Sequence, residues 1–307
     1  MGTMPVFMTA LSTILGAILF LRFGYAVGHV GLIGTLGIVV LGHLVTIPTA
    51  MAVAEIATNS KVEGGGAYYM ISRSFGLNIG ASIGIALFLS QAISVAFYVI
   101  AFAVSFEPLA DIIFHHYGFY VDNRMAGLIF MALLALLMLS KGADIGVKAL
   151  YVVVAVLLVS LGMFFMGSAY SPSSGDITAH IDNPDDFFYV FTIIFPAFTG
   201  IAAGLGLSGD LKDPKKSIPA GTMWATLVGI VVYIAVVFKL FLSASPEDLA
   251  NTDVLVMSKI AIWEPIIPIG LGCAAISSAL GSMMIAPRTL QALGVDKVFP
   301  MQLSVWF

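Results

Sequence analysis

The residues whose types and spacing could do chemistry in this sequence are small and uncharged, and they interrupt apolar stretches. In the stretch 195–209, Pro196 removes a backbone donor and the glycines after it weaken any helix. Near the N-terminus, Ser12 and Thr13 followed by Gly16 form a similar pattern. A helix interrupted inside a membrane exposes carbonyl oxygens that attract cations and N–H groups that attract anions. The two stretches therefore predict half-helices that begin at Gly16 and at Gly200, whose backbone groups bind charged ligands.

Enzymatic chemistry has no support in the sequence. We find no cluster of metal-ligating residues, no nucleophile paired with a base and no nucleotide-binding loop. The glycine run at 64–66 lacks the Gly-Lys-Ser/Thr ending of a phosphate loop. The single cysteine, Cys273, leaves no disulfide framework. We expect no enzyme activity, no cofactor and no nucleic-acid partner.

The composition is that of a protein inside a lipid bilayer. Hydrophobic residues make up 60% of the chain and charged residues 10%, and the mean hydropathy is +1.04. Soluble domains average about 45–50% hydrophobic residues and about 25% charged residues. We therefore predict an all-α, multi-pass protein of the cell membrane with about eight helices. The stretches long enough to span about 30 Å are 5–28, 31–57, 77–104, 124–140, 145–169, 187–207, 218–243 and 262–286.

Positive charges alternate between the predicted connections, which gives an orientation. One side of the membrane carries most of the lysines and arginines, whereas the other is mainly acidic, with Arg124 and Lys259 as exceptions. The positive-inside rule then places the N-terminus in the cytoplasm. The charges on the cytoplasmic side are Lys61, Arg73, Lys141, Lys148, Lys212, Lys215, Lys216, Arg288 and Lys297.

The two interrupted stretches lie five segments apart, so they cross the membrane in opposite directions. Such a matched pair indicates the binding site of an inverted-repeat transporter. A second interpretation stays open, in which the glycines only allow neighbouring helices to pack closely.

Several motifs together resemble one transporter family. The stretch SGDLKDPKKSIPAGT at 208–222 resembles a polar loop of the amino acid–polyamine–organocation superfamily. The stretch ATNSKVEGGGAYYMISRSFG at 57–76 resembles, more specifically, the cation–chloride cotransporters. The same family is matched in the same order by QAISVAFYVIAFA at 91–103, FPAFTGI at 195–201 and ISSALGSMMIAPRTLQAL at 276–293.

This resemblance implies a LeuT-like fold, an inverted-repeat transporter whose helices 1 and 6 are discontinuous. We expect residues 1–307 to form a single transmembrane transporter domain, with 5–169 as the first five-helix repeat and 187–307 as an incomplete second repeat. The family's ninth and tenth helices, further C-terminal helices and cytosolic domain would lie beyond this sequence. The resemblance also allows a homodimer of the complete protein.

The resemblance further implies sites for three ions. Tyr98 on its own would suit packing as well, and paired serines often bond to their own helix. The serine pair indicates the sodium-coupled branch. A tyrosine that the family supplies to the second chloride is missing, because the last tyrosine is Tyr233. The implied residues are Gly16, Ala17, Ile18, Gly200, Ile201 and Ala202 for chloride, Thr13, Ile14, Tyr98, Pro196 and Thr199 for potassium, and Ser12, Leu15, Ala274, Ser277 and Ser278 for sodium.

We thus expect a secondary active transporter that carries out electroneutral symport of sodium and/or potassium with chloride, within a lipid bilayer. Two alternatives remain. The first is a proton-coupled amino acid permease of the same superfamily, in which Glu55 or Lys148 handles the proton. The second is a membrane scaffold fragment that does not transport.

Overall fold

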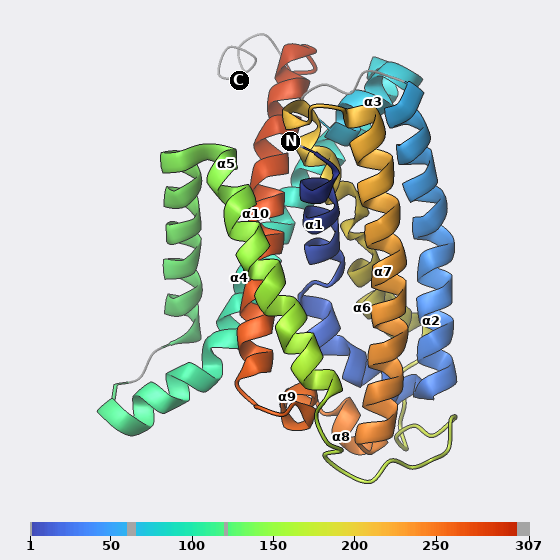
Figure 1. The fold of residues 1–307 in the computed structure, drawn as a ribbon, viewed down its shortest axis with the longest axis vertical. Helices are drawn as coiled ribbons and strands as arrows, with labels where there is room; N and C mark the ends of the chain where they lie inside the picture. Colours follow the sequence, from blue (N-terminus) through green and yellow to red (C-terminus); the bar gives the residue numbers. More distant parts are fainter. Residues whose placement is uncertain (1, 60–65, 120–121, 300–307) are drawn as a thin grey trace.

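The computed structural model describes residues 2–59, 66–119 and 122–299 as a bundle of helices without strands among them (Figure 1). The residues Lys61, Gly64 and Gly65 singled out above lie outside this description. The elements are α1 (Thr3–Ile14), α2 (Ala17–Asn59), α3 (Gly66–Phe75), α4 (Leu77–Tyr117), α5 (Asn123–Phe165), α6 (Phe187–Ile194), the 3-10 helix η1 (Phe195–Asp210), α7 (Pro214–Ser243), α8 (Pro246–Ala250), α9 (Val256–Ile260) and α10 (Ile266–Val295).

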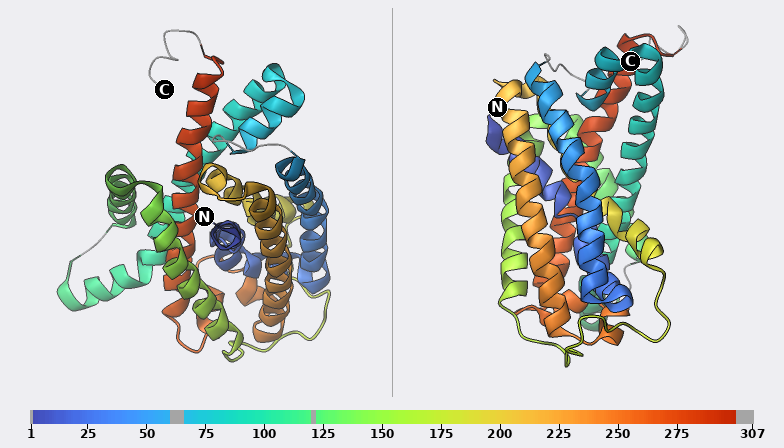
Figure 2. Two further views of the ribbon diagram at one scale, coloured as in Figure 1. Left: turned by 45° about the horizontal axis from the view of Figure 1, so that its top comes forward. Right: turned by 90° about the vertical axis from the view of Figure 1, so that its right-hand side faces the viewer.

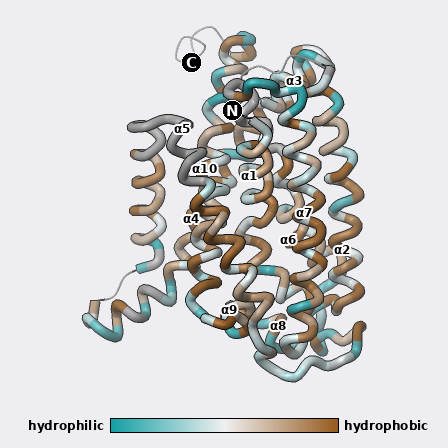
Figure 3. The backbone as a smooth tube through the Cα atoms, in the orientation of Figure 1, coloured by the Kyte–Doolittle hydropathy of each residue, from teal (hydrophilic) through white to brown (hydrophobic). Residues whose placement is uncertain are grey.

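The length and polarity of these helices fit a bilayer. Four helical segments of the described chain are long and apolar enough to cross a membrane, namely Thr3–Thr58, Leu77–Pro108, Pro214–Ser243 and Ile266–Val295. Figure 3 shows hydrophobic residues along the middle of the bundle and more hydrophilic ones on α3 and around α8. Each apolar stretch expected from the sequence is helical over most of its length.

Two of the helices contain a turn between expected segments. In α2 the backbone of Gly31 has φ +69° and ψ −179°, which breaks the helix at the expected boundary between the first and second segments. Only glycine adopts this conformation without strain. Figure 1 shows α5 folded back on itself, so that its two arms run antiparallel. These arms correspond to the expected fourth and fifth segments.

The ends of the bundle differ in charge. The N-terminus, α3, the start of α7 and the end of α10 lie together at one end, and α8 and α9 lie at the other (Figure 1). The first end carries Arg73 on α3 and Lys215 and Lys216 on α7, with Lys297 just after α10. These four residues were all expected on the same side.

The short helix α1 lies in the middle of the bundle, next to α7 and α10 (Figures 1 and 2). Its residues Leu11 and Ile14 are buried, and Val6 is fully so. A Cβ added to Gly204 or Gly221 would lie within 3 Å of the Val6 side chain. Small residues therefore let η1 and α7 approach α1 closely, as is common between membrane helices.

The sixth expected segment differs from its prediction. Its α-helix ends at Ile194, and the chain continues as a 3-10 helix from Phe195 to Asp210. The prediction of a half-helix that begins at Gly200 is therefore wrong. Pro196 cannot donate to the helix ladder, and the glycines after it favour α-helix poorly. The interruption therefore lies at the proline and is filled by 3-10 structure, which is unusual over such a length.

Candidate functional site

The first interruption separates α1 from α2, as the sequence predicted. α1 ends at Ile14 and α2 begins at Ala17, so Leu15 and Gly16 lie outside both helices. Among the residues that the structure describes, no backbone carbonyl accepts a hydrogen bond from the N–H groups of Gly16, Ala17 or Ile18. Free N–H groups at the start of a helix are also the positive end of its dipole. This position is chemically suited to an anion.

The two interrupted segments touch each other. A Cβ added to Gly200 of η1 would lie 2.6 Å from the nitrogen of Ile14 and 2.7 Å from the carbonyl carbon of Thr13. Both are backbone atoms, so they could not move aside as a flexible side chain would. The glycine therefore lets η1 lie directly against the end of α1.

Tyr233 of α7 also reaches both segments, and the sequence analysis assigned it no role. Its hydroxyl donates to the carbonyl of Ile14 and lies 2.7 Å from the carbonyl of Ala197. The residue is completely buried. No local signal could reveal this contact, because Tyr233 and Ile14 are 219 positions apart.

The two serines of α10 have different environments. Both are 1% exposed. The Ser277 hydroxyl donates to the carbonyl of Ala274 at 3.0 Å, which is the self-bonding that serine pairs often show. The Ser278 hydroxyl makes no hydrogen bond of ordinary geometry among the described residues, and the Tyr98 phenol lies near it. The Ser278 hydroxyl faces the first interruption, because a Cβ added to Gly16 would lie 3.7 Å from it.

A cavity of about 1310 Å³ leads to the interrupted segments. Tyr98 of α4, Pro196 and Thr199 of η1 and Ile18 of α2 line it. The Thr199 hydroxyl donates to the carbonyl of Pro196 at 2.7 Å. Three of the five residues expected to bind potassium therefore share this cavity with one residue expected to bind chloride.

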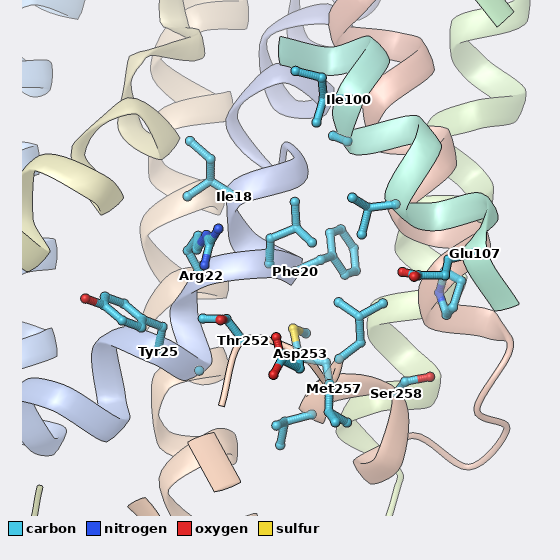
Figure 4. A pocket seen from close by; sticks show the side chains of 18 of the residues that line it. Ile18, Phe20, Arg22, Tyr25, Ile100, Glu107, Thr252, Asp253, Met257 and Ser258 are labelled. Atoms are coloured by element: carbon cyan, nitrogen blue, oxygen red, sulfur yellow. The ribbon is translucent and has the colours of Figure 1, made fainter. Parts of the chain in front are cut away.

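The outer part of the cavity carries charges of both signs. Figure 4 shows Arg22 of α2, Glu107 of α4 and Asp253 of the α8–α9 connection around it. Lys259, which also lines it, pairs with Glu264 at 2.9 Å. The hydrogen bond that Lys259 donates to Glu264 holds the pKa of the Lys259 ammonium above its ordinary value. Because many lining residues belong to α8, α9 and the chain between them, the cavity lies toward that end of the bundle.

At the opposite end, α3 is bound to the end of α10. Asp296 accepts hydrogen bonds from the Arg73 guanidinium at 2.8 and 3.2 Å and from the Tyr68 hydroxyl at 2.8 Å. Burial raises the pKa of Asp296, but these bonds outweigh it and leave the pKa below its ordinary value. Burial and the bond to Asp296 raise the pKa of Tyr68 to about 12. We call these three residues the α3–α10 joint.

The structure thus brings most of the expected ion-binding residues together. The end of α1, the start of α2, η1 and Ser278 all meet around the first interruption. The hydroxyls of Ser12 and Thr13 donate within α1, to the Thr9 carbonyl, and their oxygen lone pairs and backbone carbonyls could bind a cation. The N–H groups of Gly200, Ile201 and Ala202 do not begin a helix, because all three residues lie inside η1.

An all-α membrane bundle in which two interrupted helices meet belongs to the class of LeuT-like, inverted-repeat transporters. The chain belongs to the amino acid permease family, whose model matches residues 5–307. Members of this family are transporters, so the prediction that the chain is not an enzyme is confirmed.

Individual relatives narrow the comparison. The chain is 31% identical to solute carrier family 12 member 2 of Mus musculus over 96% of its own length and 29% of the relative's. It is 33% identical to member 1 of the same species, over 96% of its own length and 32% of the relative's. It is 31% identical to member 9 of Danio rerio, over 94% of its own length and 37% of the relative's. These relatives confirm the resemblance to the cation–chloride cotransporters, of which the chain spans about a third of the length.

Proposed function

We propose that the protein is a secondary active transporter that moves chloride together with sodium, potassium or both. The observation that carries this proposal is the direct contact between the two interrupted segments, with free N–H groups and an unpartnered hydroxyl beside it. Such a site offers donors to an anion and oxygen atoms to cations. The similarity to solute carrier family 12 supports the same assignment.

Chloride would bind at the start of α2. The free N–H groups of Gly16, Ala17 and Ile18 support this position, and Ile18 lines the cavity through which an ion could arrive. We do not propose a second chloride site at Gly200, because the N–H groups there lie inside a 3-10 helix and do not begin a helix.

The cations would bind on either side of the first interruption. For sodium, the unpartnered hydroxyl of Ser278 faces Gly16, so that it and the carbonyl of Leu15 could share an ion. For potassium, Tyr98, Pro196 and Thr199 all line the cavity and offer a phenol, a carbonyl and a hydroxyl oxygen. The remaining ligands would be the carbonyls of Thr13, Ile14, Ser12 and Ala274 and the hydroxyl of Ser277.

The proposal includes the orientation and organisation of the chain. The end that carries α3, Arg73 and Lys297 would face the cytoplasm, and the cavity would face the outside of the cell. Residues 5–169 would form the first repeat of one transporter domain, and 187–307 would belong to the second.

Uptake of rubidium, as a substitute for potassium, into liposomes that contain the intact transporter tests this function. We expect uptake that requires chloride and depends on external sodium. A membrane potential should not change the rate, because equal cation and anion charge would cancel the roughly 2.3 kcal/mol that one net charge gains per 100 mV. Proton-driven uptake of an amino acid without any need for chloride would instead identify a permease. The absence of all uptake would favour a scaffold.

A further inference from the structure

The side chain of Tyr233 connects three elements that are distant in sequence. It belongs to α7, and its hydroxyl contacts the carbonyl of Ile14, the last residue of α1, and the carbonyl of Ala197 in η1. These are the two segments whose interruptions face each other. Neither the sequence motifs nor the proposed ion ligands include this residue.

Aromatic packing fixes where the hydroxyl lies. The Tyr233 ring stacks on Phe23 with centroids 5.1 Å apart and planes 13° apart, and it meets Phe198 edge-on at 5.1 Å. The His43 ring lies 5.9 Å away. With its ring held by these neighbours, the side chain is completely buried and has little freedom to point elsewhere.

The backbone of α7 lies equally close to the first interruption. Gly229 is one helical turn before Tyr233, and a Cβ there would lie 2.6 Å from the Ile14 side chain and 3.9 Å from the Tyr233 ring. The glycine thus lets α7 sit directly against the end of α1, so the phenol can reach the Ile14 carbonyl.

The Tyr233 hydroxyl has a single proton for the two carbonyls that it contacts, and this determines the chemistry of the contact. The Ile14 carbonyl, at the end of α1, lacks an intrahelical partner, and it would repel the Ala197 carbonyl that approaches the same point. A phenol has one proton to donate, so it bonds one of the two carbonyls at a time. A carbonyl has two lone pairs, so the Ile14 carbonyl, which ends α1, keeps one of them for another ligand.

We propose that Tyr233 is a positioning residue that holds the Ile14 carbonyl, at the end of α1, and the Ala197 carbonyl of η1 in place for cation binding. This inference rests on the proposed function, because it concerns the potassium site that includes the Ile14 carbonyl. Tyr233 acts through that carbonyl and does not itself contact the ion. Removing its hydroxyl would let the carbonyls separate and would weaken potassium binding.

Tyr233→Phe tests the inference, because it keeps the stacked ring and removes only the hydroxyl. In rubidium uptake by the intact transporter, we expect the half-saturating rubidium concentration to rise roughly three- to tenfold, the range for one buried hydrogen bond. The half-saturating sodium concentration should change less. Thr226→Val is the matched control, since it removes a buried hydroxyl of α7 that bonds only to the Thr222 carbonyl, at 2.9 Å.

If Tyr233 had only a structural role, Tyr233→Phe would lower the amount of folded protein and the maximal rate of uptake. The half-saturating rubidium concentration would stay at the parent value. That result would overturn the inference. If Tyr233→Phe does not fold, Gly229→Ala decides, because its added Cβ pushes Ile14 away and leaves the phenol intact. An unchanged rubidium dependence of this variant would overturn the inference as well. Failure of the parent protein to transport rubidium would instead refute the proposed function.

Discussion

At the scale of single residues, Ser278 has the environment that most requires a ligand. Its hydroxyl is buried in the bundle near the Tyr98 phenol and makes no hydrogen bond of ordinary geometry among the described residues, whereas the neighbouring Ser277 bonds to its own helix. An unsatisfied buried polar group costs about 1–3 kcal/mol. A sodium ion bound between Ser278 and the first interruption would remove this cost.

We therefore predict that Ser278→Ala weakens sodium binding. The half-saturating sodium concentration for rubidium uptake should rise roughly five- to 150-fold, which corresponds to the loss of about 1–3 kcal/mol. Ser282→Ala removes another buried hydroxyl, one helical turn further along α10, and should leave the sodium dependence unchanged. Equal sodium dependence of the parent and Ser278→Ala would show that sodium does not bind at this hydroxyl.

The residues also show what sequence can and cannot reveal. Gly16 was identified because a glycine after two small polar residues interrupts an apolar stretch, which is a local signal. Both serines of α10 were identified from the family resemblance, but only packing distinguishes the bonded Ser277 from the unpartnered Ser278. Tyr233 was missed, because its partners are carbonyls brought to it by two other elements.

At the scale of elements, the close contact between η1 and α1 depends on Gly200. We predict that Gly200→Ala abolishes chloride-dependent rubidium uptake and lowers the melting temperature, because the new methyl group would overlap the backbone of Thr13 and Ile14. Gly162→Ala in α5 is the matched control, since a Cβ there meets no other atom within 4 Å. Its uptake should equal that of the parent. Normal uptake by Gly200→Ala would show that the two interruptions need not touch.

The interruptions themselves were only partly predictable. The first lies where Gly16 predicted it. The second was expected to release a new half-helix at Gly200, but the helix ends earlier and the chain continues as η1. The sequence contains both Pro196 and four glycines in this stretch, so several positions could interrupt the helix. Which of them does so depends on the packing of η1 against α1 and α7.

The α3–α10 joint gives a prediction about pH. Because the pKa of Asp296 is lowered in the folded protein, its ionised form stabilises the joint above the ordinary value of 3.8, and this is lost only as the pH falls through the lower folded value. Asp296→Asn should therefore lower the melting temperature by the same amount at pH 6, 7 and 8. The effect should be small, about 0.2–1 kcal/mol, since the Arg73 side chain is 51% exposed.

The matched control for the joint is Asp182→Asn, an exposed carboxylate of the connection before α6, which should leave the melting temperature unchanged at every pH. A difference between parent and Asp296→Asn that grows or shrinks between pH 6 and 8 would mean that another group, with a pKa in that range, controls the joint.

At the scale of the whole molecule, the positions of the charged residues predicted which connections share an end of the bundle. No sequence motif predicted a contact between residues as well. The alternation of basic and acidic connections follows from the cost of moving lysine and arginine across a bilayer, so it acts on every segment at once. In the structure the basic residues on α3 and α7 share one end of the bundle. The short helices α8 and α9 at the other end were not expected, because each has only five residues.

The proposed orientation predicts which end an impermeant reagent can reach. Cys273 is the single cysteine, so its replacement by alanine gives a background for cysteines placed one at a time. Ser174→Cys, in the exposed connection before α6, should react with an impermeant maleimide added outside intact cells. Ser74→Cys, on the exposed surface of α3, should react only after the membrane is permeabilised. The reverse pattern would show that the cavity opens to the cytoplasm and that the basic end faces outward, contrary to the positive-inside rule.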